Sequence, residues 1–240
     1  MRDSDYVVVI PVYNHGSTVM PLADFFTEKK LPLILVDDGS NEKTKEYLRK
    51  VKEKYPSVIL ITLARNGGKG AAVLAGLDEA ASQGYSYILQ VDADGQHDVL
   101  MADSFLDASC AHPDAVICGY PVYDHSVPAI RKIGRKLTCG MVVAETWSHD
   151  IKDAMCGFRI YPVKSVFRVK DDIRTFRMGF DLEVMVRMAW LKIPVISMPV
   201  RVTYPQDGIS NFRMFRDNLE ISRIHAALFI GKLWRSIRHD

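Results

Sequence analysis

The sequence of 240 residues lacks several features that mark whole classes of protein. No apolar run approaches the ~18 residues that a membrane-spanning helix needs, so no transmembrane segment is expected. The amino terminus enters a predicted strand without the charged and apolar regions of a secretory signal. Long blocks of Lys and Arg are missing and the net charge is +2, so nucleic acid is not an expected partner. We therefore expect a cytoplasmic protein.

Cysteine is scarce, and its spacing carries no metal or disulfide signal. The four cysteines form no C-x-x-C pair; they are Cys110, Cys118, Cys139 and Cys156. A disulfide framework and a zinc ribbon are not expected, and the thiols should be reduced. Cys156 lies near His149 in the chain, and we expect it to be a half-buried thiol rather than a nucleophile.

Several nucleotide and catalytic motifs are also missing. No G-x-x-x-x-G-K-[ST] sequence occurs, which excludes a P-loop NTPase, and no G-x-S-x-G marks a hydrolase. Residues 68–73 fail the dinucleotide fingerprint because Val73 stands where Gly or Ala belongs. The seven histidines form no H-E-x-x-H zinc motif.

The first half of the chain alternates regularly between short apolar runs and helical patterns. We expect strands at residues 6–12, 33–36, 58–63, 85–92 and 115–118, and helices at 17–29, 42–54, 71–82 and 100–111. Near-continuous apolar strands separated by helices are typical of a parallel sheet that is covered on both faces. The fold class is therefore α/β.

The second half is less regular. Helices are expected at residues 128–146, 180–191 and 212–238, a loop entering a strand at 153–161, and a strand at 195–204. Apolar residues fall nearly all round the last helix, which indicates a partner surface. That surface is either the rest of the chain or a second subunit, so an oligomer is compatible with the sequence. Because basic residues outnumber acidic ones there, peripheral docking on an anionic membrane is the alternative.

One stretch, residues 87–97, combines a buried strand with a polar end. Asp92 and Asp94 follow the apolar run, and Gln96 and His97 come directly after them. Carboxylate and amide oxygens at this spacing favour Mg²⁺ or Mn²⁺, which can neutralise the charge on a departing diphosphate. An Asp-rich turn without chemistry is the simpler alternative, because Asp and Gly also favour turns.

Three further strand ends carry polar or glycine-rich segments. They are Pro11-Val12-Tyr13-Asn14, Asp37-Asp38-Gly39-Ser40 and Arg65-Asn66-Gly67-Gly68-Lys69-Gly70. In a parallel sheet such ends converge on one crevice. A base can stack on Tyr13 and pair with Asp38, while Lys69 and the amides of the glycine-rich loop suit phosphate. Together with residues 92–97, they predict a nucleotide site.

These four segments resemble, in order and spacing, the signature of family 2 glycosyltransferases. More narrowly, they resemble the dolichol- and polyprenyl-phosphate sugar synthases. The likeness continues in Asp153-Ala154-Met155-Cys156-Gly157-Phe158-Arg159, in Gly179-Phe180-Asp181-Leu182-Glu183 and in residues 199–210. Residues 204–212 are also similar to small bacterial glycosyltransferases of lipid and aryl-polyene tailoring clusters.

The resemblance implies a GT-A fold with a mostly parallel central sheet, in a single domain over residues 1–211, with a helical extension at 212–240. It implies inverting transfer of a sugar from a UDP- or GDP-sugar donor to a lipid or lipid-phosphate acceptor, with Mg²⁺ or Mn²⁺. It also implies peripheral contact at the inner face of the membrane.

The resemblance further implies roles for individual residues. Donor binding falls to Pro11, Tyr13, Asn14, Asp38, Asn66, Gly67, Lys69 and Asp92. Metal binding falls to Asp94 and Gln96, and catalysis to Asp153 and Asp94. Contacts with the acceptor or its phosphate fall to Arg131, Arg159, Asp181, Glu183, Ser210 and Arg213.

Two departures and two alternatives accompany this interpretation. Pro205 and Asn211 stand where the synthases carry an arginine and a lysine, and Arg213 or Arg216 could supply the missing charge. Asp153 would be a general base toward a hydroxyl acceptor, would orient a phosphate acceptor, or would only cap the turn before Gly157. The alternatives are a nucleotidyltransferase and a non-catalytic protein that binds sugar nucleotides.

Overall fold

The structure is a computed structural model that describes residues 5–123, 129–203 and 214–238. The side chains of residues 123, 129–132, 214–217 and 237–238 are not described. Of the predicted site residues, Ser210 and Arg213 therefore lie outside the described residues, and Arg131 is placed only as part of a helix. Within the described parts, no helix combines the length and apolar character needed to cross a bilayer.

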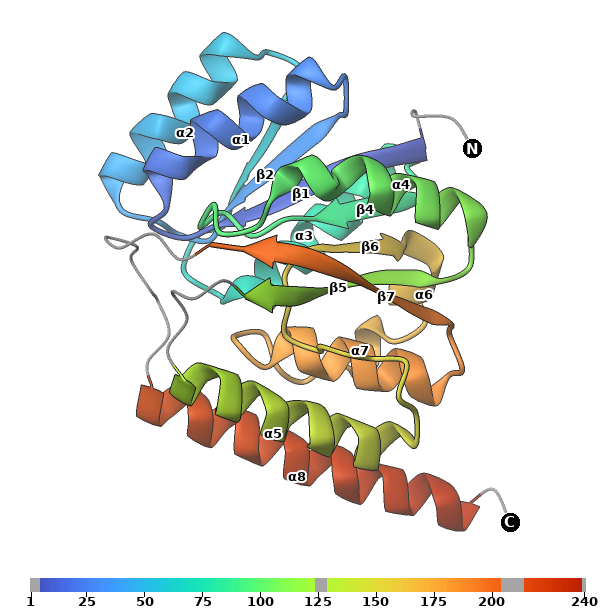
Figure 1. The fold of residues 1–240 in the computed structure, drawn as a ribbon. Coiled ribbons are helices and arrows are strands. Elements are labelled where there is room, and N and C mark those ends of the chain that lie inside the picture. Colours follow the sequence, from blue (N-terminus) through green and yellow to red (C-terminus); the bar gives the residue numbers. More distant parts are fainter. Residues whose placement is uncertain (1–4, 124–128, 204–213, 239–240) are drawn as a thin grey trace.

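The strands of the described chain form one seven-stranded sheet in the order β3-β2-β1-β4-β6-β5-β7 (Figure 1). They are β1 (Tyr6–Val12), β2 (Leu33–Asp37), β3 (Ile59–Thr62), β4 (Tyr87–Gln90), β5 (Val116–Tyr123), β6 (Arg159–Pro162) and β7 (Val195–Val202). The helices are α1 (Gly16–Glu28), α2 (Glu42–Lys54), α3 (Lys69–Ser82), α4 (Ala102–Ala111), α5 (Ala129–Thr146), α6 (Val163–Phe167), α7 (Phe180–Trp190) and α8 (Met214–Arg238), with 3₁₀ turns η2 (Val99–Met101) and η3 (Lys170–Asp172). This architecture confirms the predicted fold class.

Each face of the sheet has its own apolar core. On one face, α1, α2 and α4 pack around Phe26, Leu48 and Phe105. On the other, α3 and α7 contribute Leu77 and Phe180. All seven residues of β1 are buried, as a strand covered on both faces requires. Helix α2 begins where the Asn41 side chain accepts a hydrogen bond from Thr44 N, an ordinary N-cap.

One strand differs from the parallel pattern expected for the first half. Strand β6 lies between β4 and β5 and runs antiparallel to both. Strands β4 and β5 are therefore not neighbours, although they follow one another in the predicted alternation. The reversal means that residues just before β6, including Asp153 and Gly157, lie at the same edge as the ends of β1, β2 and β4.

Helices α5 and α8 form an outer layer beyond α7 and lie side by side along their length (Figure 1). Ile224 and Leu228 of α8 are buried in the core, and His225 Nδ1 lies 2.7 Å from Glu145 Oε1 of α5 in the interface. The rest of α8 exposes several large apolar side chains. Packing on the same chain therefore covers one stripe of α8, not its whole circumference.

Candidate active site

The loops that follow β1, β2 and β3 meet at one edge of the sheet. The register pairs Val12 with Asp37 at the ends of β1 and β2, so the following residues are adjacent. Asn14 joins the two loops: its Oδ1 accepts from Asn41 N at 2.9 Å, and its backbone N donates to Ser40 Oγ at 3.1 Å. Tyr13 is half-buried beside them. Pro11 differs from these residues because it is buried within β1 and offers no polar side chain.

Asp38 is almost fully buried, and the glycine-rich loop binds its carboxylate. Asp38 Oδ1 accepts from Gly67 N at 2.7 Å, and Oδ2 accepts from Gly68 N and Asn66 Nδ2, each at 2.9 Å. Burial raises the pKa of Asp38. The hydrogen bonds from the backbone N–H groups of Gly67 and Gly68 and the charge of Arg177 act to lower the pKa and offset part of the rise. A Cβ on Gly68 would lie 2.3 Å from Phe176 O, and Gly68 has φ +98°, so only glycine fits there.

Lys69 lies between two carboxylates rather than in open solvent. Its Nζ is 2.6 Å from Asp92 Oδ1 and 2.6 Å from Asp181 Oδ2. Burial alone would lower the pKa of Lys69, but the charges of Asp181 and Asp92 outweigh it and raise the pKa. Burial acts to raise the pKa of Asp92, but the charge of Lys69 outweighs burial, so the pKa of Asp92 is lowered. Lys69 and Asp92 are therefore both held in their charged forms.

Two buried side chains, those of Gln90 and Arg159, donate hydrogen bonds to Asp181. Gln90 Nε2 donates to Asp181 Oδ1 at 3.2 Å, and Arg159 NH1 donates to Asp181 O at 3.0 Å. Arg159 is completely buried and also donates to Tyr161 Oη at 2.9 Å. Asp181 and Arg159 were both predicted to contact the acceptor. The structure places them beneath Lys69, where Arg159 has no exposed surface from which to reach an acceptor.

Asp94 and Gln96 lie in the turn that follows β4. Asp94 Oδ1 accepts from Gln96 N at 3.0 Å, and Thr18 Oγ1 of α1 anchors the turn by donating to Ala93 O. Burial, and then the charge of Asp92, raise the pKa of Asp94. A cation beside Asp94 would offset both effects, because it stabilises the ionised carboxylate.

The turn carries the two kinds of oxygen ligand that a divalent metal prefers, a carboxylate and an amide, and metal binding by Asp94 and Gln96 stays a prediction. Within the described residues, no cluster of three or more His, Cys, Asp or Glu side chains is arranged around a metal position. The protein would therefore supply the Asp94 carboxylate and the Gln96 amide oxygen. Water and the donor diphosphate would supply the remaining oxygen ligands, as is common for Mg²⁺.

His97 ends the same turn and contacts a buried thiol. His97 Nε2 lies 3.4 Å from Cys156 Sγ. Burial lowers the pKa of His97 and raises that of Cys156 well above its ordinary value. A raised pKa disfavours the thiolate of Cys156, and that Cys156 is not a nucleophile stays a prediction. The sequence suggested His149 as its neighbour, and the structure shows His97 instead.

Asp153 forms an ion pair with a residue that sequence reasoning had not assigned to the site. Arg135 of α5 contacts both carboxylate oxygens, with Nε to Oδ2 at 2.5 Å and NH2 to Oδ1 at 3.2 Å. Asp153 also accepts from Met155 N at 2.8 Å, so it caps its own turn as well. The signal that could have found Arg135 is the basic cluster at residues 131–136, just before the Asp153 segment.

Glu183 was predicted to contact the acceptor, but its observed contacts are internal. Its Oε2 accepts from Thr175 N at 2.8 Å and from Arg174 N at 3.0 Å, and its Oε1 lies 2.6 Å from Arg187 NH2. Glu183 therefore shapes residues 174–177, which lie over the glycine-rich loop: Gly70 N donates to Phe176 O at 2.8 Å. Sequence reasoning missed Arg177 on this segment.

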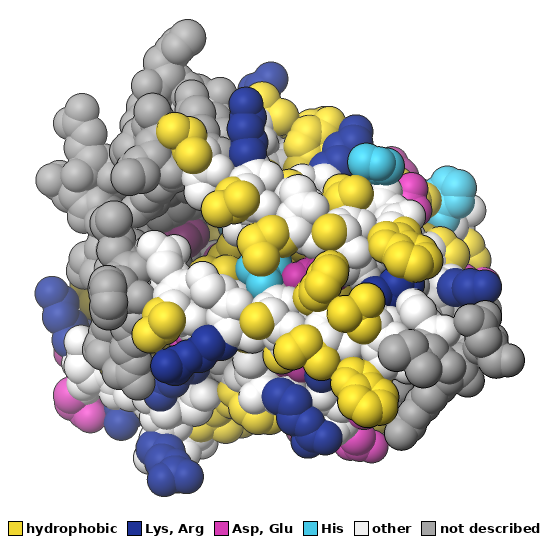
Figure 2. Space-filling model, turned by 90° about the horizontal axis from the view of Figure 1, so that it is seen from below, with side chains coloured by type: hydrophobic (Ala, Val, Ile, Leu, Met, Phe, Trp, Pro, Cys, Tyr) yellow, Lys and Arg dark blue, Asp and Glu magenta, His cyan; other side chains and the backbone are white. Residues whose placement is uncertain are grey.

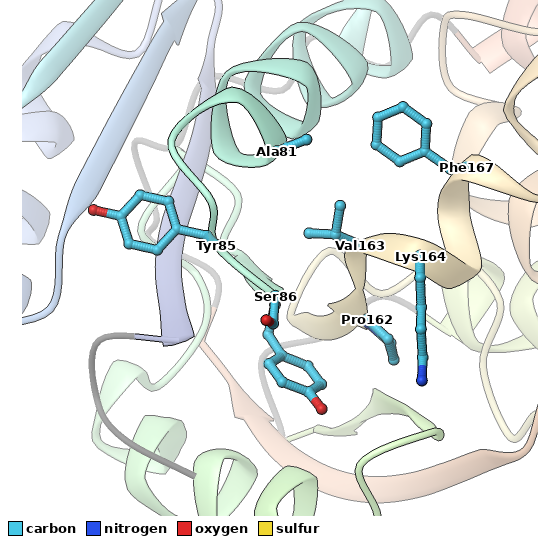
Figure 3. A pocket seen from close by; sticks show the side chains of 8 residues that line it. Ala81, Tyr85, Ser86, Pro162, Val163, Lys164 and Phe167 are labelled. Carbon is cyan, nitrogen blue, oxygen red and sulfur yellow. The ribbon is translucent and has the colours of Figure 1, made fainter.

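Two hollows flank the sheet at opposite ends. One of about 300 Å³ lies between α1 and the turn after β4, where His97 and Thr18 line it. The other, of about 470 Å³, lies where β4 begins and β6 ends; Tyr85, Ser86, Pro162 and Phe167 surround it (Figure 3). The larger hollow is therefore remote from the edge that carries the predicted site residues.

Comparison with known proteins decides the family. Residues 7–168, more than half of the chain, match the model of glycosyl transferase family 2. The chain belongs to that family. This confirms the resemblance given by the strand-end motifs.

The relatives of this family 2 chain act on lipid phosphates, according to their names. A dolichyl-phosphate beta-glucosyltransferase of Homo sapiens is 29% identical over 218 residues, covering 82% of this chain and 66% of the relative. That of Dictyostelium discoideum is 28% identical over 217 residues, covering 82% and 65%. An undecaprenyl-phosphate mannosyltransferase of Micrococcus luteus is 22% identical over 207 residues, covering 81% and 82%. The chain thus spans about two thirds of the length of these two glucosyltransferases, 66% and 65%.

Solved structures share the fold at low identity. Glucosyl-3-phosphoglycerate synthase of M. tuberculosis superposes with a TM-score of 0.69 at 12% identity, over 95% of this chain and 80% of that one. A complex of the same synthase with Mn²⁺ and UDP gives 0.67 at 13% identity, over 95% and 79%. A mannosyltransferase of Pyrobaculum calidifontis with GDP-Man and Mn²⁺ gives 0.60 at 16% identity, over 98% and 64%.

Proposed function

We propose that this chain is an inverting, metal-dependent glycosyltransferase that moves a sugar from a nucleotide-diphosphate donor to a polyprenyl phosphate. The observation that carries the proposal is the convergence of Asp38, Asp94 and Asp153 at one sheet edge, each held by backbone or side-chain donors. The named relatives, which act on dolichyl and undecaprenyl phosphates, support the acceptor class.

The donor end of the reaction uses the strand-end loops. Tyr13 and Asp38 would receive the base, and Asp94 with Gln96 would hold Mg²⁺ or Mn²⁺. Bound there, the ion would neutralise charge that develops on the departing diphosphate. Asp92 stays paired with Lys69, so its part is to keep Lys69 in place beside the sugar and phosphate rather than to bind metal.

The acceptor end uses the Arg135–Asp153 pair. A guanidinium that binds a carboxylate through two nitrogens has the same fork that binds phosphate. An incoming acceptor phosphate would compete with Asp153 for Arg135, and Asp153 would then orient it. An anionic phosphate oxygen needs no general base to attack the anomeric carbon. A hydroxyl acceptor would gain nothing from Arg135, so the pair favours phosphate as the nucleophile.

The outer helices would bring the lipid acceptor to this edge. Ile133 and Leu137 lie one turn apart on α5 and are 68% and 67% exposed. Arg135, two residues from each, lies on the opposite side of α5, toward Asp153. The phosphate of the acceptor would therefore enter on one side of α5 while its hydrocarbon tail stays on the other.

The exposed face of α5 and α8 fits peripheral contact with an anionic membrane. Viewed from this side, hydrophobic side chains spread across the surface with Lys and Arg around them (Figure 2). The exposed apolar residues are Ile133, Leu137, Trp147, Leu219, Phe229, Ile230, Leu233 and Trp234. Lys232 lies 4.3 Å from the ring centre of Trp147, so cations accompany the aromatic rings, as at lipid headgroups.

A transfer assay tests the proposal. The full chain is incubated with Mn²⁺, labelled UDP-, GDP- and dTDP-sugars, and either undecaprenyl phosphate or undecaprenol. We expect a lipid-linked sugar from one donor class with the phosphate only. Equal product from undecaprenol would contradict the phosphate acceptor. Release of pyrophosphate from a nucleoside triphosphate and a sugar 1-phosphate would show a nucleotidyltransferase, and nucleotide binding without transfer would show a non-catalytic binder.

A further inference from the structure

The carboxylate of Asp153 is enclosed, and most of its hydrogen-bonding sites are taken. Its side chain is only 4% exposed. Oδ1 accepts from Arg135 NH2 at 3.2 Å and from Met155 N at 2.8 Å, and Oδ2 accepts from Arg135 Nε at 2.5 Å. Since each carboxylate oxygen offers two lone-pair sites, Oδ1 is fully occupied and Oδ2 keeps one site. A general base needs a free lone pair that faces the nucleophile, so Asp153 is poorly placed to take a proton in this arrangement.

Two thiols fix the backbone at Asp153. Cys118 Sγ of β5 donates to Asp153 O at 3.2 Å. Cys139 Sγ of α5 donates to the preceding carbonyl, Lys152 O, at 3.1 Å. Burial raises the pKa of each thiol to about 11, so both stay protonated and can donate. Because the backbone is held on both of these elements, movement of the Arg135 side chain is the simplest way to uncover the carboxylate.

Arg135 is more accessible than the carboxylate that it binds. Its side chain is 24% exposed, against 4% for Asp153. An anion that enters from solvent therefore meets the guanidinium first. A phosphate that takes the guanidinium from Asp153 would free the carboxylate, and the same phosphate would then lie beside it in place of water.

The ion pair of Asp153 also differs from the other ion pairs at this edge. Asp92 and Asp181 share Lys69, which belongs to the glycine-rich loop on the donor side. The partner of Asp153 is the cation that we propose for the acceptor phosphate. The release of Asp153 therefore depends on the acceptor.

We propose that Arg135 selects phosphate over water as the nucleophile, by withholding Asp153 from water until an acceptor phosphate is bound. This inference rests on the proposed transfer to a polyprenyl phosphate. In transfer, a phosphate oxygen attacks the anomeric carbon, and the diphosphate leaves with the electron pair of the broken bond; no proton moves. In hydrolysis, water makes the same attack and gives a proton to Asp153, and the products are free sugar and nucleoside diphosphate.

Hydrolysis of the donor without an acceptor tests the selection. The full chain is incubated with Mn²⁺ and labelled UDP-glucose or GDP-mannose, and the release of free sugar is measured. Arg135→Met removes both donors to Asp153 and keeps a long side chain, so release should rise about 10-fold or more over the wild-type chain. Arg135→Gln keeps one donor and should give a smaller rise. Lys136→Met, which removes an exposed cation of the same helix, is the matched control and should leave release unchanged.

A second substitution identifies the base. In Arg135→Met/Asp153→Asn the carboxylate is gone, so release should return to the rate of the wild-type chain. Release as fast as in Arg135→Met alone would overturn the role of Asp153. Release by Arg135→Met no faster than by the wild-type chain would overturn the inference. Thermal unfolding is measured for each variant, and if Arg135→Met is unfolded at the assay temperature, Arg135→Gln decides by the same criteria.

Transfer to undecaprenyl phosphate by the wild-type chain is measured in parallel. If the chain transfers sugar and Arg135→Met does not raise hydrolysis, this inference fails while the proposed function stands. If the wild-type chain transfers no sugar with either donor, the proposed function fails and the inference with it.

Discussion

Two regions of the molecule differ in where their charged and apolar side chains lie: the sheet edge that carries the strand-end loops, and the outer layer formed by α5 and α8. At the edge, charges lie inside and are matched: Lys69 binds Asp92 and Asp181, and backbone amides bind Asp38. In the outer layer, large apolar groups lie outside, with Trp147 74% and Trp234 60% exposed. Charges fixed before a ligand arrives suit a small polar substrate, since little must reorganise on binding. Apolar surface left uncovered suits a broad apolar partner.

An ion pair connects the two regions. Arg135 belongs to α5, yet its guanidinium binds Asp153 at the edge. In the function that we propose, the edge carries the donor chemistry, the layer delivers the acceptor, and Arg135 lies between them. Variants that damage one region should leave the functions of the other intact.

The largest expected effect comes from the edge. Asp94→Ala should lower sugar transfer roughly 10³-fold, because the carboxylate that we propose as a metal ligand is gone. Stability should change little, since among the described residues Asp94 accepts a hydrogen bond from Gln96 N alone, and its charge is repelled by that of Asp92. Turnover and thermal unfolding are measured together, with Asp107→Ala on the exposed side of α4 as the control. Near-normal turnover with metal present would show that Asp94 is not the metal ligand.

The second-largest effect is expected at the ion pair between Arg135 and Asp153. Arg135→Gln removes the charge that we propose for the acceptor phosphate, so the acceptor KM should rise about 10- to 100-fold. Nucleotide affinity should change much less than the acceptor KM, because Arg135 belongs to α5 and binds Asp153 rather than the Asp38 and Tyr13 loops that we propose for the base. Lys136→Gln, an exposed cation of the same helix, is the control. An equal rise in acceptor KM for both variants would indicate a general charge effect rather than a phosphate site.

The smallest effect belongs to the outer layer. Trp147→Ala and Trp234→Ala should each weaken binding to phosphatidylcholine vesicles containing phosphatidylglycerol by about 10-fold, because each removes aromatic surface from the bilayer. Vesicle binding is measured by flotation with and without phosphatidylglycerol. The affinity of each variant for UDP is measured as well, and an unchanged value would show that the sheet edge is intact. Phe167→Ala, an exposed aromatic outside the layer, is the control. Unchanged flotation in the double variant would mean that another partner covers this face.

Much of the fold could be read from local pattern. Helix α2 was predicted at its observed bounds, and β1 likewise, because the apolar periodicity and the Asn41 cap are properties of neighbouring residues. Helix α3 begins at Lys69, two residues before the prediction, since the helix starts directly at the left-handed Gly68. The antiparallel β6 could not be foreseen, because strand direction depends on how the chain returns to the sheet.

The sequence by itself determined which residues sit at strand ends, because turn chemistry and hydrophobic period are local. It therefore placed Asp38, Lys69 and Asp94 in one predicted site. Only the tertiary structure decided what each of them contacts. Lys69 meets Asp181 and Asp153 meets Arg135 because helices distant in the sequence pack onto the same edge. Ion pairs of this kind depend on the relative placement of whole elements, which no local pattern encodes.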